Sequence, residues 1–374
     1  MAEPAIRVQV YSDLDTLPEP VSDFIAAMSG QDFFRTIAFL RIALRTVGDR
    51  ADTLELHAAE SRGRVVAVLI LRGRQGKGRL ATRLAVSPSH GTDATIFGPL
   101  LAPEDGMAGL AAIAAGLARA AHPFHVFRLE CLERDAPETA ALIAALRRQG
   151  MMVTPFADPH SIYSDDVRGL DFAQYLARRS PKMRQFLERE VGKLTQSGRS
   201  RFEVVTGGPG LKSALIDYAL VDLQSFREPE ANADCLAALL EHAARAGILR
   251  LGLLYVDDVP AAAQIWIVSA GRATVWRARY AKQFARLSVG AAMTFEMFRH
   301  MLTHESLTAI DYGPSDDDGR QEWSSRNRLR IGVIVFNLRT AKGWISLARH
   351  NAGVVLSQVR RALRAVRRLV SRRS

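Results

Sequence analysis

Hydrophobic residues follow the same order of patterns twice along the chain. Residues 53–73 and 249–271 each contain an apolar run, a short polar turn and a second apolar run, which predicts a β-hairpin. A segment with helical spacing precedes each hairpin, "DFFRTIAFLRIALRTV" in one case and "ADCLAALLEHAARAG" in the other. A strand candidate and a helix follow each hairpin: residues 94–100 with "MAGLAAIAAGLARAAH", and residues 273–280 with the stretch after them. The pattern predicts two related α/β halves in tandem.

Residues 170–198 lie between the halves and show helical spacing on both sides of Ser180 and Pro181. Proline fits the first turn of a helix and serine fits its cap, so we predict two consecutive helices here. Basic residues outnumber acidic ones on the polar positions: Arg178, Arg179, Lys182, Arg184, Arg189 and Lys193 against Glu188 and Glu190. Two interpretations remain open, a solvated connecting segment and a binding site for an anionic group.

The stretch "YAKQFARLSVGAAMTFEMFRHM", residues 280–301, joins a predicted strand to a predicted helix. The strand is "RATVWRARYAK", and the helix has apolar residues Ala291, Phe295, Phe298 and Leu302 on one face. The first N–H groups of that helix carry a partial positive charge and can hold a phosphate. An ordinary strand-to-helix turn is the alternative. The candidate cradle consists of Arg286, Leu287, Ser288, Val289, Gly290 and Ala291.

A second group of polar residues follows a short apolar strand that begins at residue 307. Asp316, Asp317 and Asp318 form a run of carboxylates, and Arg320 and Trp323 come next. The strand-like "RLRIGVIVFNL" then closes the segment. An acidic run of this kind is either solvated surface or, because Tyr312 and Trp323 bracket it, part of a site.

Residues 170–343 resemble the BioF2-like, CelD-type acetyltransferase domain, a branch of the GNAT superfamily that also resembles the FemAB aminoacyl ligases. The resemblance lies in a strand, a loop with Ser and Gly before a helix, and the strand end "DYG" at residues 311–313. The loop aspartate corresponds to Asp316 and the loop aromatic to Trp323. Ser315, Gly319 and Arg320 replace the second glycine, the tyrosine and the lysine of the family's loop.

The resemblance implies acyl transfer from acetyl-CoA or another acyl-CoA to an acceptor, most often an amine. It also implies an α/β fold of tandem GNAT-like halves, each with a mixed, mostly antiparallel sheet flanked by helices. Asp316 is the candidate for holding or deprotonating the acceptor. Tyr280 and Tyr312 are candidates for protonating the departing thiolate, with aromatic packing as the alternative role. The predicted catalytic set is Asp316, Tyr280, Tyr312, Arg320 and Trp323.

Other titratable residues give weaker signals. His242 and His300 lie on predicted helices, where most histidines are surface or capping groups. Glu228 and Glu230 lie in a predicted loop and are candidates for acceptor binding. No spacing typical of metal ligands occurs, so no metal site is predicted. Cys131 and Cys235 lie far apart in apolar surroundings, which favours reduced thiols over a disulfide.

Two rival functions belong to other classes. A FemAB-like transferase that uses aminoacyl-tRNA would need a basic groove, for which residues 178–193 are the only support. A catalytically inactive GNAT-fold binding protein would fit the loss of the family tyrosine at Gly319.

Charge and length set the remaining expectations. The chain has 374 residues and a net charge of +11, of which the eight arginines of residues 344–374 supply +8, so no specific nucleic acid is expected as partner. The expected partner is a small-molecule or envelope-precursor acceptor. One apolar stripe at helical spacing consists of Leu356, Val359, Leu363, Val366 and Val370. Residues 356–373 are therefore predicted to form a helix that either binds an anionic membrane or packs on the body of the protein. With no secretory signal or membrane span in the sequence, we expect a cytoplasmic protein, peripheral at the inner face if this helix binds the membrane. The predicted units are residues 1–165, 166–343 and 344–374.

Overall fold

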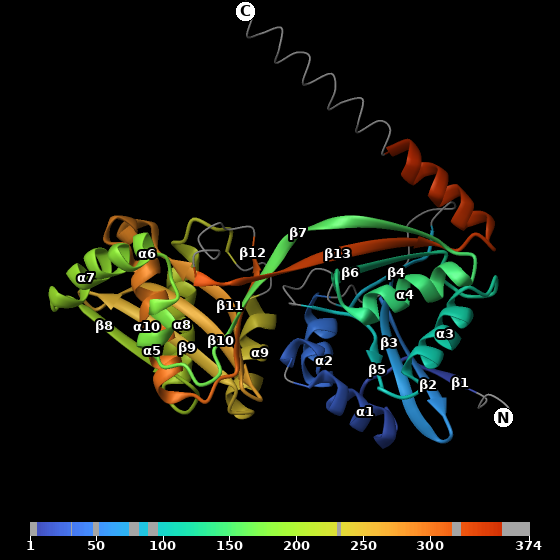
Figure 1. Cartoon of the computed structure of the whole chain (residues 1–374), viewed down its shortest axis with the longest axis horizontal. Coiled ribbons are helices and arrows are strands. Elements are labelled where there is room, and N and C mark those ends of the chain that lie inside the picture. Colours follow the sequence, from blue (N-terminus) through green and yellow to red (C-terminus); the bar gives the residue numbers. More distant parts are fainter. Residues whose placement is uncertain are drawn as a thin grey trace, which may run out of the picture.

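The computed structural model describes residues 6–30, 32–47, 52–74, 82–88, 96–229, 233–315 and 323–353. Two groups of strands and helices stand side by side, and two long strands run across both (Figure 1). The strands of the first half are β1 (Arg7–Tyr11), β2 (Thr53–Ser61), β3 (Arg64–Arg74), β4 (Leu84–Val86), β5 (Leu100–Leu101), β6 (Val126–Glu133) and β7 (Met152–Asp166). Those of the second half are β8 (Ser200–Val205), β9 (Leu249–Val256), β10 (Val259–Ser269), β11 (Arg272–Tyr280), β12 (Ala309–Ser315) and β13 (Arg326–Phe336).

Helices flank the strands of each half (Figure 1). The first half contains α1 (Glu19–Ser29), η1 (Phe33–Arg35), α2 (Ile37–Val47), α3 (Gly106–Leu117) and α4 (Pro137–Arg148). The second contains α5 (Phe172–Ala177), α6 (Pro181–Phe186), η2 (Leu187–Val191), α7 (Gly192–Gln196), α8 (Leu211–Leu223), α9 (Ala233–Arg245), η3 (Lys282–Leu287) and α10 (Val289–His304). Both predicted hairpins, β2–β3 and β9–β10, are confirmed. Ser180 caps α6 as predicted, because its hydroxyl accepts a hydrogen bond from the Met183 amide.

The two halves share one sheet because their last strands are exchanged. The strand order is β1-β2-β3-β4-β6-β13-β7-β12-β11-β10-β9-β8, so β13 pairs with β6 of the first half and β7 pairs with β12 of the second. β7 and β13 also pair with each other antiparallel over most of their length, from Arg326 with Ser164 to Phe336 with Met152. Figure 1 shows these two strands crossing from one group to the other. Neither half is therefore complete in its own segment of chain.

Each half contains one short parallel pair with a helix as its connection. β4 pairs with β6 around α3, and β11 pairs with β12 around α10. The β11–β12 pairing covers only residues 272–274 with 309–311, although β11 continues to Tyr280 and β12 to Ser315. The two strands therefore separate toward their carboxyl ends, beside the start of α10.

Three large apolar clusters hold the fold. One lies under α3 and α4, and one lies between α10 and the helices α5 to α7. The third joins the halves, with α1 and α2 on one side and α8 and α9 on the other. Phe34 and Trp276 meet edge to face in it, with ring centroids 5.5 Å apart. Burial of such rings gives a large, non-directional stabilisation, so the halves are packed against each other as well as hydrogen-bonded.

Other predictions are only partly matched by the structure, or concern residues that lie outside the described ones. The strand predicted over residues 94–100 appears only as the short β5, with residues 89–95 outside the description, and the strand β4 was missed. Residues 341–353 are helical, while the predicted arginine-rich helix of residues 356–373 lies outside the described residues. Among the described helices, none has the length and apolarity to cross a membrane. Both cysteines are buried, and no disulfide joins them to each other. The predicted division at residues 165 and 343 stays a prediction.

Candidate active site

A cavity of about 380 Å³ opens where β11 and β12 separate. The end of β11, the first turn of α10 and the α6 residues Met183 and Phe186 form its walls. Tyr312 and Trp323 form its floor. The predicted strand-to-helix junction therefore lies at a cavity. Its lining is Met183, Phe186, Arg227, Gln264, Val275, Ala278, Arg279, Tyr280, Ala285, Ser288, Val289, Gly290, Ala291, Met293, Thr294, Phe298, Tyr312 and Trp323.

The start of α10 faces this cavity. After η3 the chain passes through Ser288 in the left-handed conformation, with φ 52° and ψ 33°, and α10 begins at Val289. The Ser288 hydroxyl makes no capping hydrogen bond to the helix. The N–H groups of a first helical turn have no partner inside the helix and carry a partial positive charge. The junction can therefore receive an anionic group.

The predicted cradle is divided by the structure. Ser288, Val289, Gly290 and Ala291 line the cavity, whereas Arg286 and Leu287 belong to η3 and are absent from its lining. Positive charge at the cavity comes instead from Arg227 and Arg279. Arg279 is held by Asp222, whose Oδ1 lies 2.5 Å from its Nε. Neither arginine belongs to the predicted cradle, because the position of both depends on contacts between distant segments.

Tyr280 and Gly290 lie against each other at the mouth of the cavity. A Cβ atom placed on Gly290 would be 3.2 Å from Cδ1 of the Tyr280 ring. Tyr280 is 40% exposed, and its ring centroid is 5.8 Å from that of Phe226. A larger residue at position 290 would have to push the tyrosine ring aside. Gly290 therefore keeps the ring and the helix terminus close together.

A chain of hydrogen bonds fixes the polar wall. Trp266 Nε1 donates to Gln264 Oε1 at 2.8 Å, and Gln264 Nε2 donates to Thr294 Oγ1 at 2.7 Å. The Thr294 hydroxyl in turn donates to the Gly290 carbonyl at 2.9 Å. Buried polar groups that are all paired keep one orientation, so this wall is preorganised. Gln264 and Thr294 were not predicted as site residues, because their roles depend on β10 packing against α10.

The floor of the cavity is a buried hydrogen-bonded cluster. Tyr312 Oη lies 2.6 Å from Tyr175 Oη, and the two hydroxyls lie 2.6 and 2.5 Å from the carbonyl oxygen of Trp323. Arg179 Nη1 also donates to this carbonyl and forms an ion pair with Asp165. The rings of both tyrosines and of Trp323 stack on Phe298. The cluster connects α5, β7 and β12 to the residue that follows the acidic loop.

This environment separates the two tyrosine candidates. Burial raises the pKa of Tyr312 well above its usual value, and the neighbouring Tyr175 raises it further. The Tyr312 hydroxyl is therefore neutral and is already held by Tyr175 and Trp323. Tyr280 has an exposed position at the cavity mouth. Of the two, Tyr280 is the one whose hydroxyl is accessible to a ligand.

The remaining candidates lie in different places. Trp323 is buried at the cavity floor. Asp316, Arg320 and Glu230 lie outside the described residues, and Glu228 is exposed. His242 stacks on Phe33 and His300 lies beside His304, and neither belongs to the cavity lining. Burial lowers the pKa of both histidines, which favours their neutral form.

A second cavity, of about 360 Å³, lies between the halves, and half of its lining residues are charged. Asp311 lies at 2.6 Å from Arg272 and 3.6 Å from Arg328, and Glu133 also pairs with Arg328. Asp311 is 5% exposed, and within the described structure its Oδ1 has no hydrogen-bond partner. Burial raises the pKa of Asp32, on the same lining, to about 6. The unsatisfied carboxylate oxygen favours a hydrogen-bond donor here rather than a phosphate.

A family model matches the part of the chain that forms most of the first cavity. Residues 181–322 match the family model described as an acetyltransferase (GNAT) domain, a segment that contains the start of α10 and most of the first cavity's lining. No curated protein matches the sequence.

Solved structures share the fold at low sequence identity. FemX has 11% identity and a TM-score of 0.61, with 88% of this chain and 98% of that chain covered. The C-terminal domain of a putative lysylphosphatidylglycerol synthetase from Agrobacterium fabrum has 14% identity and a TM-score of 0.50, with 89% and 95% covered. L-PGS from Bacillus licheniformis has 11% identity and a TM-score of 0.50, with 86% and 91% covered.

These similarities confirm the predicted fold class of two mixed α/β halves flanked by helices. They do not separate the BioF2-like, CelD-type branch from others. The second half of the chain therefore matches a GNAT acetyltransferase domain, and the fold of nearly the whole chain is similar to that of FemX.

Proposed function

We propose that the protein transfers an acyl group from acetyl-CoA or another acyl-CoA to an amine acceptor. The observation that carries this proposal is the start of α10 at the cavity, where Ser288 to Ala291 meet the separated ends of β11 and β12. The pyrophosphate of CoA would lie on the first N–H groups of α10, with Arg227 and Arg279 nearby. The pantetheine arm would then enter between the two strands.

The residues of the cavity would orient the two substrates for direct transfer. The acceptor nitrogen attacks the thioester carbon, a C–N bond forms, the C–S bond breaks, and the sulfur leaves as a thiolate. In this proposal Tyr280 gives the thiolate a proton, and the proton lost by the amine restores the tyrosine through solvent. Holding both reactants in one orientation can supply about 7–11 kcal/mol of the reduction in barrier.

Asp316 is proposed to hold or deprotonate the acceptor ammonium, as the resemblance implies. Asp316→Asn should lower turnover while the affinity for acyl-CoA stays nearly unchanged, and Asp317→Asn should change turnover much less. Steady-state kinetics and calorimetry on the two variants would measure this. Equal small effects at both positions would place the acceptor elsewhere, and the charged cavity beside Asp311 would be the next place to examine.

The alternatives predict different ligands. A transferase that uses aminoacyl-tRNA would bind tRNA at the basic residues 178–193, and an inactive binding protein would bind acyl-CoA without turnover. Thermal-shift measurements with acetyl-CoA, longer acyl-CoAs and bulk tRNA separate a protein that binds acyl-CoA from one that binds tRNA. Stabilisation by an acyl-CoA, followed by release of free thiol with an amine panel, would support the proposal; stabilisation by tRNA alone would contradict it.

The acceptor is proposed to be a small molecule or an envelope precursor. The arginine-rich residues 356–373 support a membrane-proximal location, since each basic residue near an anionic surface contributes roughly 1 kcal/mol to binding. Sedimentation with anionic liposomes at low and high salt would test this, using the full chain and a chain ending at Gly343. Equal sedimentation of both chains would rule out the tail as the anchor.

A further inference from the structure

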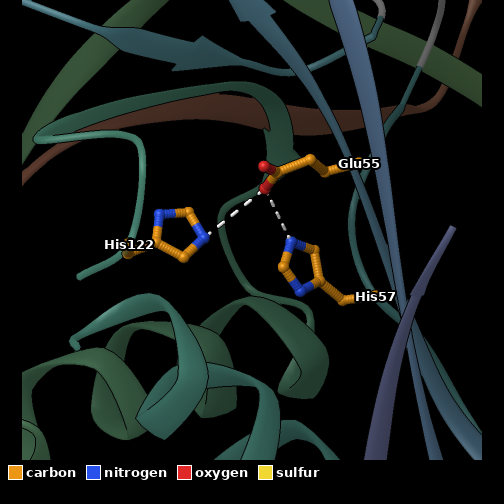
Figure 2. A group of neighbouring side chains, drawn as sticks. All are labelled: Glu55, His57 and His122. Atoms are coloured by element: carbon orange, nitrogen blue, oxygen red, sulfur yellow. Dashed lines mark hydrogen bonds and ion pairs between the residues drawn. The ribbon is translucent and has the colours of Figure 1, made fainter. Parts of the chain in front are cut away.

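Three side chains of the kinds that bind metal ions, Glu55, His57 and His122, meet in the first half (Figure 2). Glu55 and His57 are two residues apart on β2, so both point to the same face of the sheet. Their cross-strand partners on β3, Leu71 and Leu69, belong to the apolar cluster under α3. Two polar residues therefore stand on an apolar face, where burial is costly unless their polar atoms have partners.

His122 comes from the segment between α3 and β6 and completes the group. Glu55 Oε2 lies 3.1 Å from His57 Nε2 and 3.4 Å from His122 Nε2. The ligand atoms of all three residues lie within 4.8 Å of one another. Zinc bonds of about 2.0–2.1 Å in a tetrahedron place neighbouring ligand atoms roughly 3.3–3.4 Å apart, so the group has nearly the spacing that zinc needs.

The surroundings suit a bound cation. The side chains of His57, His122 and Glu55 are 4%, 9% and 17% exposed, so the group is shielded but still open on the Glu55 side. The His122 ring also packs beside Phe124 and Phe127, which limits its orientations.

An ion would replace the contacts of both histidines with Glu55, and one further contact must change when it binds. Without it, the Phe124 amide donates to His122 Nδ1 at 3.2 Å, so the hydrogen of the neutral ring is on Nε2 and faces Glu55. Coordination by Nε2 would move that hydrogen to Nδ1, and the Phe124 amide would have to turn away. Phe124 lies outside the helices and strands, so this movement breaks no hydrogen bond of the sheet.

We propose that Glu55, His57 and His122 bind a zinc ion that joins the segment between α3 and β6 to strand β2. Two imidazoles and one carboxylate favour zinc over calcium or magnesium, which prefer oxygen ligands alone. Three protein ligands leave the fourth position for water. The site is independent of the proposed acyl transfer, since none of its residues lines either cavity.

The test is zinc binding by the full chain, purified without a histidine tag and stripped with chelator. After reconstitution with zinc and gel filtration, we expect about one zinc per wild-type chain and less than about a tenth of that in His122→Gln, because a three-ligand site does not survive the loss of a ligand. His125→Gln is the matched control, since it removes a histidine from the same segment that is not in the group. It should retain zinc as the wild type does.

Two further measurements distinguish the loss of a zinc ligand from the loss of the fold. Chelator should lower the Tm of the wild type and of His125→Gln but leave that of His122→Gln unchanged, and circular dichroism verifies that the variant is folded. Cobalt in place of zinc should give the visible absorption of a tetrahedral site in the wild type, and this absorption should be lost in His57→Gln. If the wild type retains no more zinc than His122→Gln, or shows no cobalt spectrum, the three residues form only a hydrogen-bonded cluster and the proposal is wrong.

Discussion

The residues that precede α3 and α10 share one backbone conformation, but the two helix starts have different surroundings. Asp105 and Ser288 precede the two helices, and both are left-handed, with φ 58° and 52°. At α3 the Asp105 carboxylate accepts a hydrogen bond from the Ser61 hydroxyl at 2.8 Å. At α10 the corresponding residue is an uncharged serine, and the helix start faces a cavity.

Packing strengthens the contrast between the two junctions. A Cβ atom on Gly109 of α3 would lie 2.9 Å from the side chains of Ala67 and Val66, so α3 sits directly on β3. A negative charge and close packing together leave no place for a phosphate at α3. A helix terminus is therefore not a site by itself. At α10 the terminus is joined by an opening between strands and by two nearby arginines, Arg227 and Arg279.

The largest effect is expected from Gly290→Asp. The new side chain would press on the Tyr280 ring and place a carboxylate where the pyrophosphate is proposed to bind. We expect the affinity for acetyl-CoA to fall by more than about 100-fold, a loss of about 2.7 kcal/mol of binding free energy. Calorimetry measures the change. Gly116→Asp, on α3 where a Cβ atom meets nothing within 4 Å, is the control and should bind as the wild type does.

The next effect separates the two tyrosines. Tyr280→Phe should lower turnover by about 100-fold with little change in affinity, which is typical of the loss of a general acid. Tyr312→Phe should lower the free energy of unfolding by about 1 kcal/mol, because its hydroxyl is held by Tyr175 and Trp323, and should leave turnover within about twofold. Kinetics and chemical denaturation of both variants measure this. The reverse pattern would assign the acid to Tyr312.

A smaller effect is expected when the residue before α3 is copied to α10. Ser288→Asp should weaken acetyl-CoA binding by about tenfold through charge repulsion, about 1.4 kcal/mol. Aspartate tolerates the left-handed conformation, so the fold should be retained. The opposite change, Asp105→Ser, should create no second site, because α3 remains packed on β3. A second binding site in calorimetry of Asp105→Ser would show that the charge of Asp105 alone prevents acetyl-CoA from binding at the start of α3.

The smallest effect concerns charge at the cavity mouth. Arg227 is exposed there, and exposed ion pairs contribute roughly 0.2–1 kcal/mol. Arg227→Gln should therefore reduce affinity for acetyl-CoA by about threefold at low salt and by less at high salt. Titrations at two salt concentrations measure this. An effect that does not depend on salt would mean that Arg227 acts through packing rather than charge.

Local patterns predicted what depends on neighbours in sequence. The helix with an apolar face from Ala291 to Leu302 occurs as α10, which begins at Val289, and the two hairpins were placed correctly, because helical and strand periodicity are local signals. The exchange of β7 and β13 was not predicted, since strand pairing over such distances leaves no local mark. The same holds for Tyr175 and Tyr312, which are 137 positions apart and share a hydrogen bond.

The candidate site shows the same limit. Four of the six predicted cradle residues line the cavity, but Arg227, Arg279 and Gln264 enter it from separate segments. The proposed zinc ligands of the first half had only the two-residue spacing of Glu55 and His57 as a sequence signal, and His122 joins them from the segment between α3 and β6. Ligand sets that depend on tertiary contacts cannot be identified from spacing alone.

Amide hydrogen exchange tests the central claim most directly. Amides of a first helical turn lack partners within the helix, so they exchange readily until a ligand covers them. Saturating acetyl-CoA should slow exchange in peptides that contain residues 288–291 and leave peptides that contain residues 105–108 unchanged. Protection at residues 105–108, or none at residues 288–291, would contradict the assignment of acyl-CoA to the start of α10.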